Sequence, residues 1–116
     1  MSQTNRDEIL IRQIAESIEL ISEYIDGVDI EEFLELTQTQ DAVLRRLQII
    51  REAAKLISDS VKEITPNIPW KNMAGMRDIV IHQYWSVDLR LTRNTISEVL
   101  PNLLPLLSEA LKKMSD

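Results

Sequence analysis

Residues 9–28 read ILIRQIAESIELISEYIDGV, and this stretch decides the fold class. Its large apolar side chains recur every three or four residues, which is the period of one face of an α-helix and not the alternation of a strand. We therefore predict a long amphipathic helix that begins near Asn5, with Glu8 three residues on as in a capping box, and ends near Gly27. Its apolar stripe comprises Ile11, Ile14, Ile18, Ile21, Ile25 and Val28.

The same spacing returns further along the chain. After a short turn of helix capped by Asp29, Thr37 and Gln40 repeat the capping-box pattern and predict the start of a second long helix. This helix should end at Thr65, because the residue before a proline disfavours helix. Its apolar stripe comprises Val43, Leu47, Ile50, Ala54, Ile57, Val61 and Ile64.

Prolines and glycines are few, and they mark the remaining helices. Pro69 suits the first turn of a third long helix, which we expect to run from about residue 70 into the 90s. Pro101 interrupts it near its end. Asn102 is the predicted cap of a last helix, whose first turn holds Pro105 and whose last turn holds two lysines that suit the helix dipole.

These elements predict an all-α fold, an antiparallel up-and-down bundle of three long helices and one or two short ones. A length of 116 residues is that of one ordinary domain, so residues 1–116 are interpreted as a single helical domain. A coiled coil is the alternative, but each stripe covers only three or four heptads and the connections are short. A mostly apolar third helix suggests that a second copy covers part of it.

Composition excludes several classes of function. The chain has no cysteine, which rules out disulfides, thiolate metal sites and cysteine nucleophiles. Its opening is polar, without the apolar segment of a signal peptide, and no stretch approaches the roughly 20 apolar residues of a membrane helix. We expect a cytoplasmic protein without a membrane partner.

The net charge of −6 argues against a general nucleic-acid binder. The charge is unevenly spread, however, because residues 1–41 hold two arginines against eleven acids whereas residues 42–93 hold nine basic side chains against five acids. A locally positive face or an ordinary solvated surface of i,i+4 pairs would both fit this distribution.

One short stretch, GMRDIVIHQY at residues 75–84, carries candidate chemistry. Asp78 and His82 are four residues apart, so the carboxylate can hold one imidazole nitrogen and leave the other to work. Arg77 and Tyr84 share a stripe. Arg77 and His82, in contrast, point roughly 140° apart on a helix, so a site that uses both needs arginine's reach, a distorted helix or two copies meeting in a dimer. We favour the dimer.

The residues alone leave other interpretations open. A lone histidine on an apolar helix is often a core or interface residue, and an Arg–Asp pair is often only a surface ion pair. One histidine and no cysteine make a zinc site a poor fit, while an all-carboxylate magnesium site stays open. The sequence contains no glycine-rich phosphate loop, nucleophile elbow or aromatic RNA-binding signature.

The run PWKNMAGMRDIVIHQYWSVDL, residues 69–89, resembles the signature segment of the HepT-like proteins, the toxin half of toxin–antitoxin pairs that join a HEPN domain to a minimal nucleotidyltransferase. Its centre is arginine, four residues, histidine, one residue and tyrosine, here Arg77, His82 and Tyr84. Residues 41–55, DAVLRRLQIIREAAK, resemble the second long helix of that family. Three positions depart from the family pattern: Asp78 replaces a common asparagine, Arg51 a common glycine and Arg93 an aromatic residue.

The resemblance implies a HEPN-like homodimer within a type VII-like toxin–antitoxin pair, with metal-independent endoribonuclease activity at a composite site. Arg77 and His82 would be catalytic and Asp78 supporting, with no metal or cofactor for cleavage. The partner nucleotidyltransferase would use ATP to transfer AMP to Tyr84, and the assembly would be a larger hetero-oligomer. The alternatives are a non-catalytic helical dimer that binds a nucleotide or the nucleotidyltransferase, and a structural adaptor. The sequence does not identify the RNA or the cleavage site.

Overall fold

The computed structural model describes residues 3–75 and 89–115, and its regular structure there is entirely helical, which confirms the predicted all-α class. Along the chain the elements are α1 (Gln3–Tyr24), α2 (Ile30–Phe33), α3 (Thr37–Leu56), α4 (Asp59–Ile64), α5 (Trp70–Ala74), α7 (Leu89–Glu98), the 3₁₀ turn η1 (Leu100–Asn102) and α8 (Leu103–Ser115).

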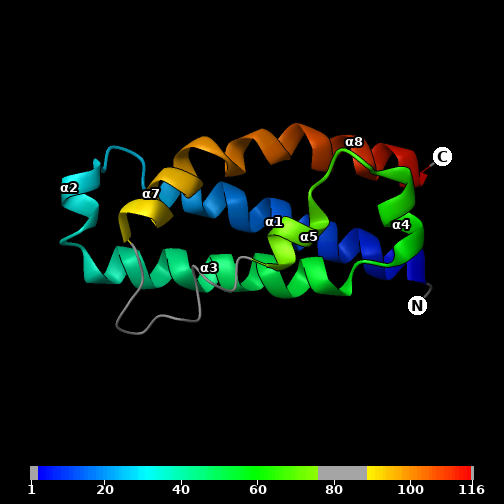
Figure 1. The fold of residues 1–116 in the computed structure, drawn as a ribbon, viewed down its shortest axis with the longest axis horizontal. Coiled ribbons are helices and arrows are strands. Elements are labelled where there is room, and N and C mark those ends of the chain that lie inside the picture. Colours follow the sequence, from blue (N-terminus) through cyan, green and yellow to red (C-terminus); the bar gives the residue numbers. More distant parts are fainter. Residues whose placement is uncertain (1–2, 76–88, 116) are drawn as a thin grey trace.

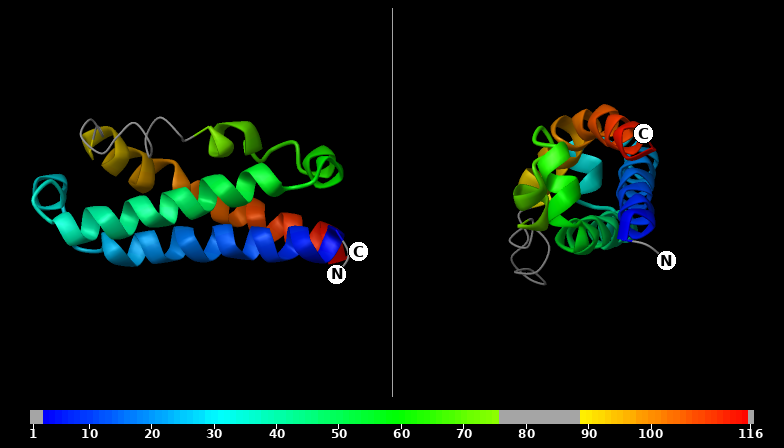
Figure 2. Two further views of the ribbon diagram at one scale, coloured as in Figure 1. Left: turned by 90° about the horizontal axis from the view of Figure 1, so that it is seen from below. Right: turned by 90° about the vertical axis from the view of Figure 1, so that its right-hand side faces the viewer.

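The bundle is built on an antiparallel pair, α1 and α3, which make the most extensive contact between described elements (Figure 1). α8 packs on α1 and runs antiparallel to it, and α5 packs on α3. Seen from one end, α1, α3 and α8 surround a common core, and α5 and α7 close its remaining side (Figure 2). The side that carries α5 and α7 is therefore the side from which the motif segment departs and to which it returns.

Both predicted apolar stripes face the core, except at their ends. The fully buried members are Ile11, Ile14, Ile18, Ile21, Val43, Leu47, Ile50 and Ala54, with Ile57 and Val61 nearly so. Ile25 and Val28 are half-buried. Ile64, the last member of the second stripe, is 45% exposed, so its predicted burial was wrong.

The second long helix is interrupted, whereas the sequence predicted it to be continuous to Thr65. α3 ends at Leu56, Ile57 is extended, and Ser58 begins a separate helix by accepting a hydrogen bond from the backbone N–H of Val61. The buried carboxylate of Asp7 on α1 accepts hydrogen bonds from the backbone N–H of Ser58 at 2.9 Å and from its hydroxyl at 2.6 Å. This distant partner favours the break, because it satisfies groups that a continuous helix would satisfy locally.

The predicted cap of the short helix is confirmed, but the next one is wrong. Asp29 accepts a hydrogen bond from the third residue of α2 and forms a full capping box there. α3, in contrast, begins after Leu36 without a side-chain cap, and Thr37 lies inside the helix. Gln40 does not form a capping box and instead donates to the backbone carbonyl of Phe33 at 2.8 Å. It thereby ties the start of α3 to the end of α2.

The predicted third and last helices are divided differently in the structure. α5 ends before Gly75, so helix does not continue unbroken from residue 70. α7, η1 and α8 follow one another along the bundle (Figure 2). Pro101 is compatible with this succession, because it lies in the first turn of η1, where its missing N–H is tolerated. Asn102 does not cap α8 but donates to the carbonyl of Glu98. The last-turn lysines lie as predicted, while Asn5 lies inside α1 instead of capping it.

Candidate functional site

The four motif residues, Arg77, Asp78, His82 and Tyr84, lie in residues 76–88, outside the residues that the structure describes. Their mutual geometry therefore stays a prediction, as does the proposed cleft between two copies. The structure does describe the two elements that hold this segment, α5 immediately before it and α7 immediately after it. How firmly these elements are attached decides whether the segment has a rigid support.

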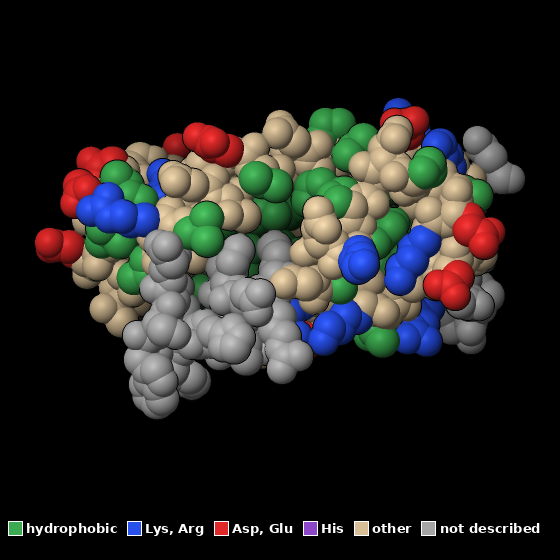
Figure 3. Space-filling view, in the orientation of Figure 1, with side chains coloured by type: hydrophobic (Ala, Val, Ile, Leu, Met, Phe, Trp, Pro, Cys, Tyr) green, Lys and Arg blue, Asp and Glu red, His purple; other side chains and the backbone are tan. Residues whose placement is uncertain are grey.

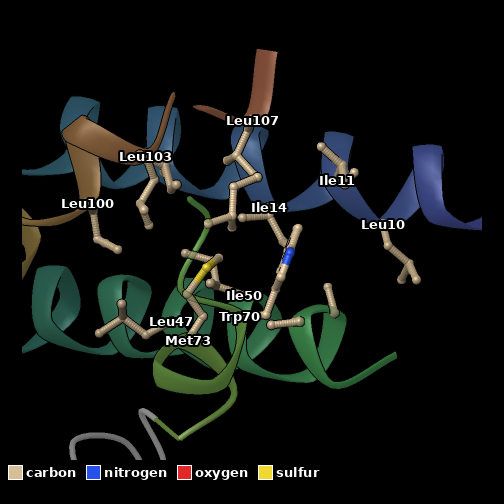
Figure 4. Packing of buried hydrophobic residues seen from close by; sticks show 14 of the residues in the cluster. Leu10, Ile11, Ile14, Leu47, Ile50, Trp70, Met73, Leu100, Leu103 and Leu107 are labelled. Carbon is tan, nitrogen blue, oxygen red and sulfur yellow. The ribbon is translucent and has the colours of Figure 1, made fainter. Parts of the chain in front are cut away.

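α5 is anchored by large side chains that enter the core. Trp70 and Met73 are 5% and 3% exposed, and both extend into the bundle beside Leu47 and Ile50 of α3 (Figure 4). The indole N–H of Trp70 donates to the hydroxyl of Thr65 at 2.9 Å, so this buried polar group is satisfied. The segment before the motif is therefore held by both packing and a directed hydrogen bond.

Gly75 adjoins the motif and ends α5 as its C-cap residue. Its backbone N–H donates to the carbonyl of Lys71 at 2.9 Å. A Cβ added at Gly75 would approach that same carbonyl oxygen to 3.2 Å. The close approach gives a physical reason for a glycine immediately before residues 76–88.

α7 is held to the opposite end of the bundle by two arginines. Arg93 donates to the backbone carbonyl of Val28 at 2.7 Å, and Arg90 pairs with Glu31 of α2 at 3.1 Å. Ile96 is 1% exposed and joins the core. Arg93 replaces the aromatic residue that the family pattern led us to expect, and it fastens α7 to the loop after α1. Within one chain this departure therefore has a structural role, whereas the sequence left packing and the dimer surface both open for it.

Arg51 is the most unusual charged side chain among the described residues of α3. Its side chain is only 8% exposed, and its one ion pair among the described residues is a long contact of 4.0 Å to the exposed carboxylate of Glu52. Its Nε atom is buried and has no hydrogen-bond partner in the part of the chain that the structure describes. Arg46, Ile49 and Ala53 line the side of α3 next to α1, so Arg51 lies on the other side, toward α5. Sequence reasoning assigned Arg51 to packing or a dimer surface and did not foresee its burial.

The surface beside α5 is locally basic. Figure 3 shows Lys and Arg side chains gathered over the region where α3, α4 and α5 meet. These three elements contribute Lys55, Lys62 and Lys71, of which the first and last are exposed and the second half-buried, while α4 also carries the exposed Asp59 and Glu63. The overall negative charge of the chain therefore coexists with a positive region close to where the motif segment leaves α5.

Comparison with known proteins places the chain in a family. The model of a family described as ribonuclease HepT-like matches residues 14–110, a range that includes the whole motif segment. The "Probable ribonuclease HepT" of Thermococcus cleftensis is 44% identical over 103 residues, which cover 89% of this chain and 92% of that protein. A protein of Caldanaerobacter subterraneus subsp. tengcongensis described as "Putative RNase" is 34% identical over the same share of each chain.

A third relative has a different organisation. A Methanocaldococcus jannaschii protein described as "Gamma-glutamylcyclotransferase and putative RNase" is 43% identical over 96 residues, which cover 83% of this chain but 43% of that longer protein. No solved structure matches the chain significantly.

The chain therefore belongs to the HepT-like family, as its signature segment led us to expect. Within residues 3–75 and 89–115, no helix is long and apolar enough to cross a membrane. In the same ranges, no group of three or more His, Cys, Asp or Glu side chains is arranged to hold a metal ion.

Proposed function

We propose that this chain is an endoribonuclease toxin that cleaves RNA without a metal, through Arg77 and His82. The observation that carries the proposal is the match to the ribonuclease HepT-like family across residues 14–110, because these residues include the complete Arg-x4-His-x-Tyr motif. The anchored α5 and the basic surface beside it support the proposal, since a rigid support and a local positive charge are what a site for RNA phosphate requires.

The proposed mechanism follows from the chemistry of RNA. The 2′-hydroxyl attacks the adjacent phosphate and loses its proton, the bond to the 5′-oxygen breaks, and the 5′-oxygen gains a proton. His82 suits either proton step, because imidazole titrates near neutrality, and such catalysis contributes typically ~10²–10⁴-fold. Arg77 stabilises the extra negative charge of the phosphorane, a role whose removal commonly costs on the order of 10²–10³-fold. Asp78 orients the imidazole of His82.

The acid and the base of this mechanism come from two copies of the chain. Arg77 and His82 diverge on one helix, so a dimer that brings two motif segments together supplies two of each group at one cleft. Each copy then contributes one imidazole, one acting as the base and the other as the acid. The nuclease is therefore a homodimer, located in the cytoplasm, with RNA as its substrate.

Regulation of this nuclease centres on Tyr84. A nucleotidyltransferase partner directs the phenol oxygen of Tyr84 onto the α-phosphate of ATP, so that a phosphotyrosyl bond forms, pyrophosphate leaves and the phenol proton is lost. The attached AMP carries a negative charge that competes with RNA phosphate for Arg77 and fills the cleft. The pair would thus form a type VII-like toxin–antitoxin system within a hetero-oligomer.

Cleavage of total RNA by the purified chain in EDTA tests the nuclease. We expect His82→Ala and Arg77→Ala each to lower the cleavage rate at least 100-fold while the dimer and the thermal midpoint are preserved. Asp78→Asn should be milder, since an amide can still hold the imidazole. Arg12→Ala, which removes an exposed arginine paired only with Glu8, is the matched control and should cleave normally.

Intact mass spectrometry after incubation with the partner and ATP tests the regulation. One or more AMP units should be added to the wild type and none to Tyr84→Phe, which should remain an active nuclease. A gain of mass that persists in Tyr84→Phe would exclude Tyr84 as the acceptor. If the chain is instead a non-catalytic dimer that binds a nucleotide or its partner, wild type and His82→Ala will both leave RNA intact.

A further inference from the structure

α3 carries a second periodic stripe, on the side opposite its buried one. We call it the outer stripe, and it comprises Ala42, Arg45, Ile49, Glu52 and Leu56, spaced three, four, three and four residues apart. These side chains are not buried by the described elements, since Leu56 is 51% exposed, Arg45 and Glu52 are exposed, and Ala42 and Ile49 are half-buried. Apolar residues seven apart, here Ala42, Ile49 and Leu56, are typical of the seam between two packed helices. No described helix of this chain covers them.

A groove of about 390 Å³ runs beside the outer stripe, between α1 and α3. α3 contributes Ile49 and Leu56 to its lining, and α1 contributes Ser17, Gln13 and Glu16 among others. The hydroxyl of Ser17 is fully buried and has no hydrogen-bond partner among the described residues. The surface next to the stripe is therefore hollowed, so that side chains of a second helix can enter it.

The outer stripe is complementary to itself when it is reversed about Ile49. An antiparallel copy centred there places Ile49 against Ile49 and Ala42 against Leu56, and it brings Arg45 within one residue, about 1.5 Å along the helix, of the level of Glu52. Each unlike pair occurs twice. Small residues then oppose large ones, and positive charges oppose negative ones. Self-complementarity of this kind is what a twofold symmetric interface requires of a single surface.

We propose that the outer stripe of α3 is the surface through which two copies of this chain associate, with the two α3 helices antiparallel about Ile49. The charge pattern favours a second copy, because the contacts of these two groups within the described chain are long: Arg45 donates to Gln48 at 3.4 Å, and Glu52 lies 4.0 Å from Arg51. Across the twofold axis Arg45 and Glu52 meet each other. The apolar seam supplies the attraction, and the two pairs of charges fix the direction and the register.

The proposed interface also determines where the two motif segments begin. This step rests on the proposed function, because the composite site of the nuclease requires a homodimer. The twofold axis of an antiparallel helix pair is normal to the plane that contains both helices, so the same flank of each protomer faces the same side of the dimer. Because α5 packs on the flank of α3 opposite to the groove, the α5 elements of both copies lie on one common side. The two motif segments, which follow α5, then start from the same face of the dimer.

Charge reversal tests the interface by sedimentation equilibrium of the full chain. Glu52→Arg and Arg45→Glu should each raise the dimer dissociation constant by about tenfold or more, because each replaces two attractions with two repulsions. The two changes combined should restore association to within about threefold of the wild type. Glu63→Arg, which makes the same charge change at an exposed site on α4, should have no effect.

Crosslinking adds a second, independent test. Ile49→Cys introduces the only cysteine into a cysteine-free chain, directly on the proposed axis, so mild oxidation should yield a disulfide-linked dimer. Glu63→Cys should yield far less. A wild-type dimer that is insensitive to charge reversal and forms no Ile49→Cys crosslink would overturn the interface and leave the proposed nuclease intact.

Two other results separate this interface from the proposed function. A wild-type chain that sediments as a monomer at micromolar concentration would overturn both the interface and the homodimer of the nuclease. A Glu52→Arg chain that becomes monomeric yet cleaves RNA at the wild-type rate would support the interface and remove the composite site from the mechanism.

Discussion

The two stripes of α3 lie on one helix and share one spacing, but they differ in chemistry and in surroundings. The inner stripe, which comprises Val43, Leu47, Ile50 and Ala54, is entirely apolar and is buried on the side of α3 that packs against α1 and α5. The outer stripe interrupts its apolar residues with Arg45 and Glu52 and remains exposed. The inner stripe is thus satisfied within one chain, whereas the outer stripe is the surface on which we propose that a second copy binds.

Under the proposed interface, one helix would specify a fold and an assembly at the same time. Apolar burial is strong but non-directional, so it suits a core whose geometry the chain connections already restrict. Charges contribute little at a surface, but they discriminate between orientations of a partner. Substitutions in the inner stripe should therefore change stability, and substitutions in the outer stripe should change association.

The largest effect is expected from Leu47→Ala in the inner stripe. Leu47 is fully buried, so truncation loses its transfer free energy and leaves a cavity, which lowers the free energy of unfolding by about 2–5 kcal/mol. Leu56→Ala makes the same chemical change in the outer stripe and should cost below ~1 kcal/mol in a monomer. Urea denaturation monitored by circular dichroism measures both. Equal losses at the two positions would contradict the division into an inner and an outer stripe.

A smaller loss is expected at the end of the inner stripe, where α3 gives way to α4. Asp7→Ala removes both hydrogen bonds that Ser58 makes to α1 and leaves a buried backbone N–H without its acceptor. The free energy of unfolding should fall by about 1–3 kcal/mol. Glu8→Ala, which removes an exposed carboxylate one residue away, should cost below ~1 kcal/mol. If the two variants melt together, the break between α3 and α4 does not depend on Asp7.

The support of α5 is expected to be weaker still. Thr65→Val deletes the hydroxyl that accepts the indole N–H of Trp70 and should cost about 1 kcal/mol, with faster amide exchange in α5. Thr95→Val is the matched control, because the Thr95 hydroxyl bonds only within its own helix, to the carbonyl of Leu91. Unchanged exchange in α5 would show that packing alone holds it.

The smallest effect belongs to the surface pair between α7 and α2. Arg90→Ala breaks an ion pair whose side chains are 60% and 71% exposed, so the expected loss is below ~1 kcal/mol and should shrink further in high salt. Arg93→Ala should cost more, since its partner is the backbone carbonyl of Val28 in a half-buried site. Thermal melts at low and high salt distinguish the two. The reverse order would mean that charge at the surface, and not the buried contact, holds α7.

Local periodicity was enough to predict the class of fold and most of the core, because a buried helix face requires apolar residues spaced three and four apart. It failed where a distant residue decides the outcome. The break at Ser58 depends on Asp7, 51 residues earlier, and Gln40 reaches a carbonyl of the preceding helix instead of capping its own. Capping patterns at Asn5 and Asn102 also matched in sequence but not in structure. Hydrogen bonds between distant residues, such as that from Ser58 to Asp7, leave no mark on helical periodicity.

The candidate site was found by another kind of signal. Spacing alone placed Arg77 and His82 on diverging faces, and only the resemblance to HepT-like proteins, which the family match confirms, joined them into a motif. The outer stripe is hard to recognise in the sequence, because Arg45 and Glu52 fit a locally positive face or a solvated surface equally well. Composition does not distinguish a solvent-exposed surface from an interface between two copies of one chain.

End-group analysis of cleaved RNA tests the central claim most directly. A 5′-labelled RNA is incubated with the purified chain in EDTA, and the products are resolved by mass. Attack by the 2′-hydroxyl under the control of His82 and Arg77 predicts 2′,3′-cyclic phosphate and 5′-hydroxyl ends, with no cleavage by His82→Ala. Products with 3′-hydroxyl and 5′-phosphate ends, cleavage only after magnesium is added, or undiminished cleavage by His82→Ala would contradict the account.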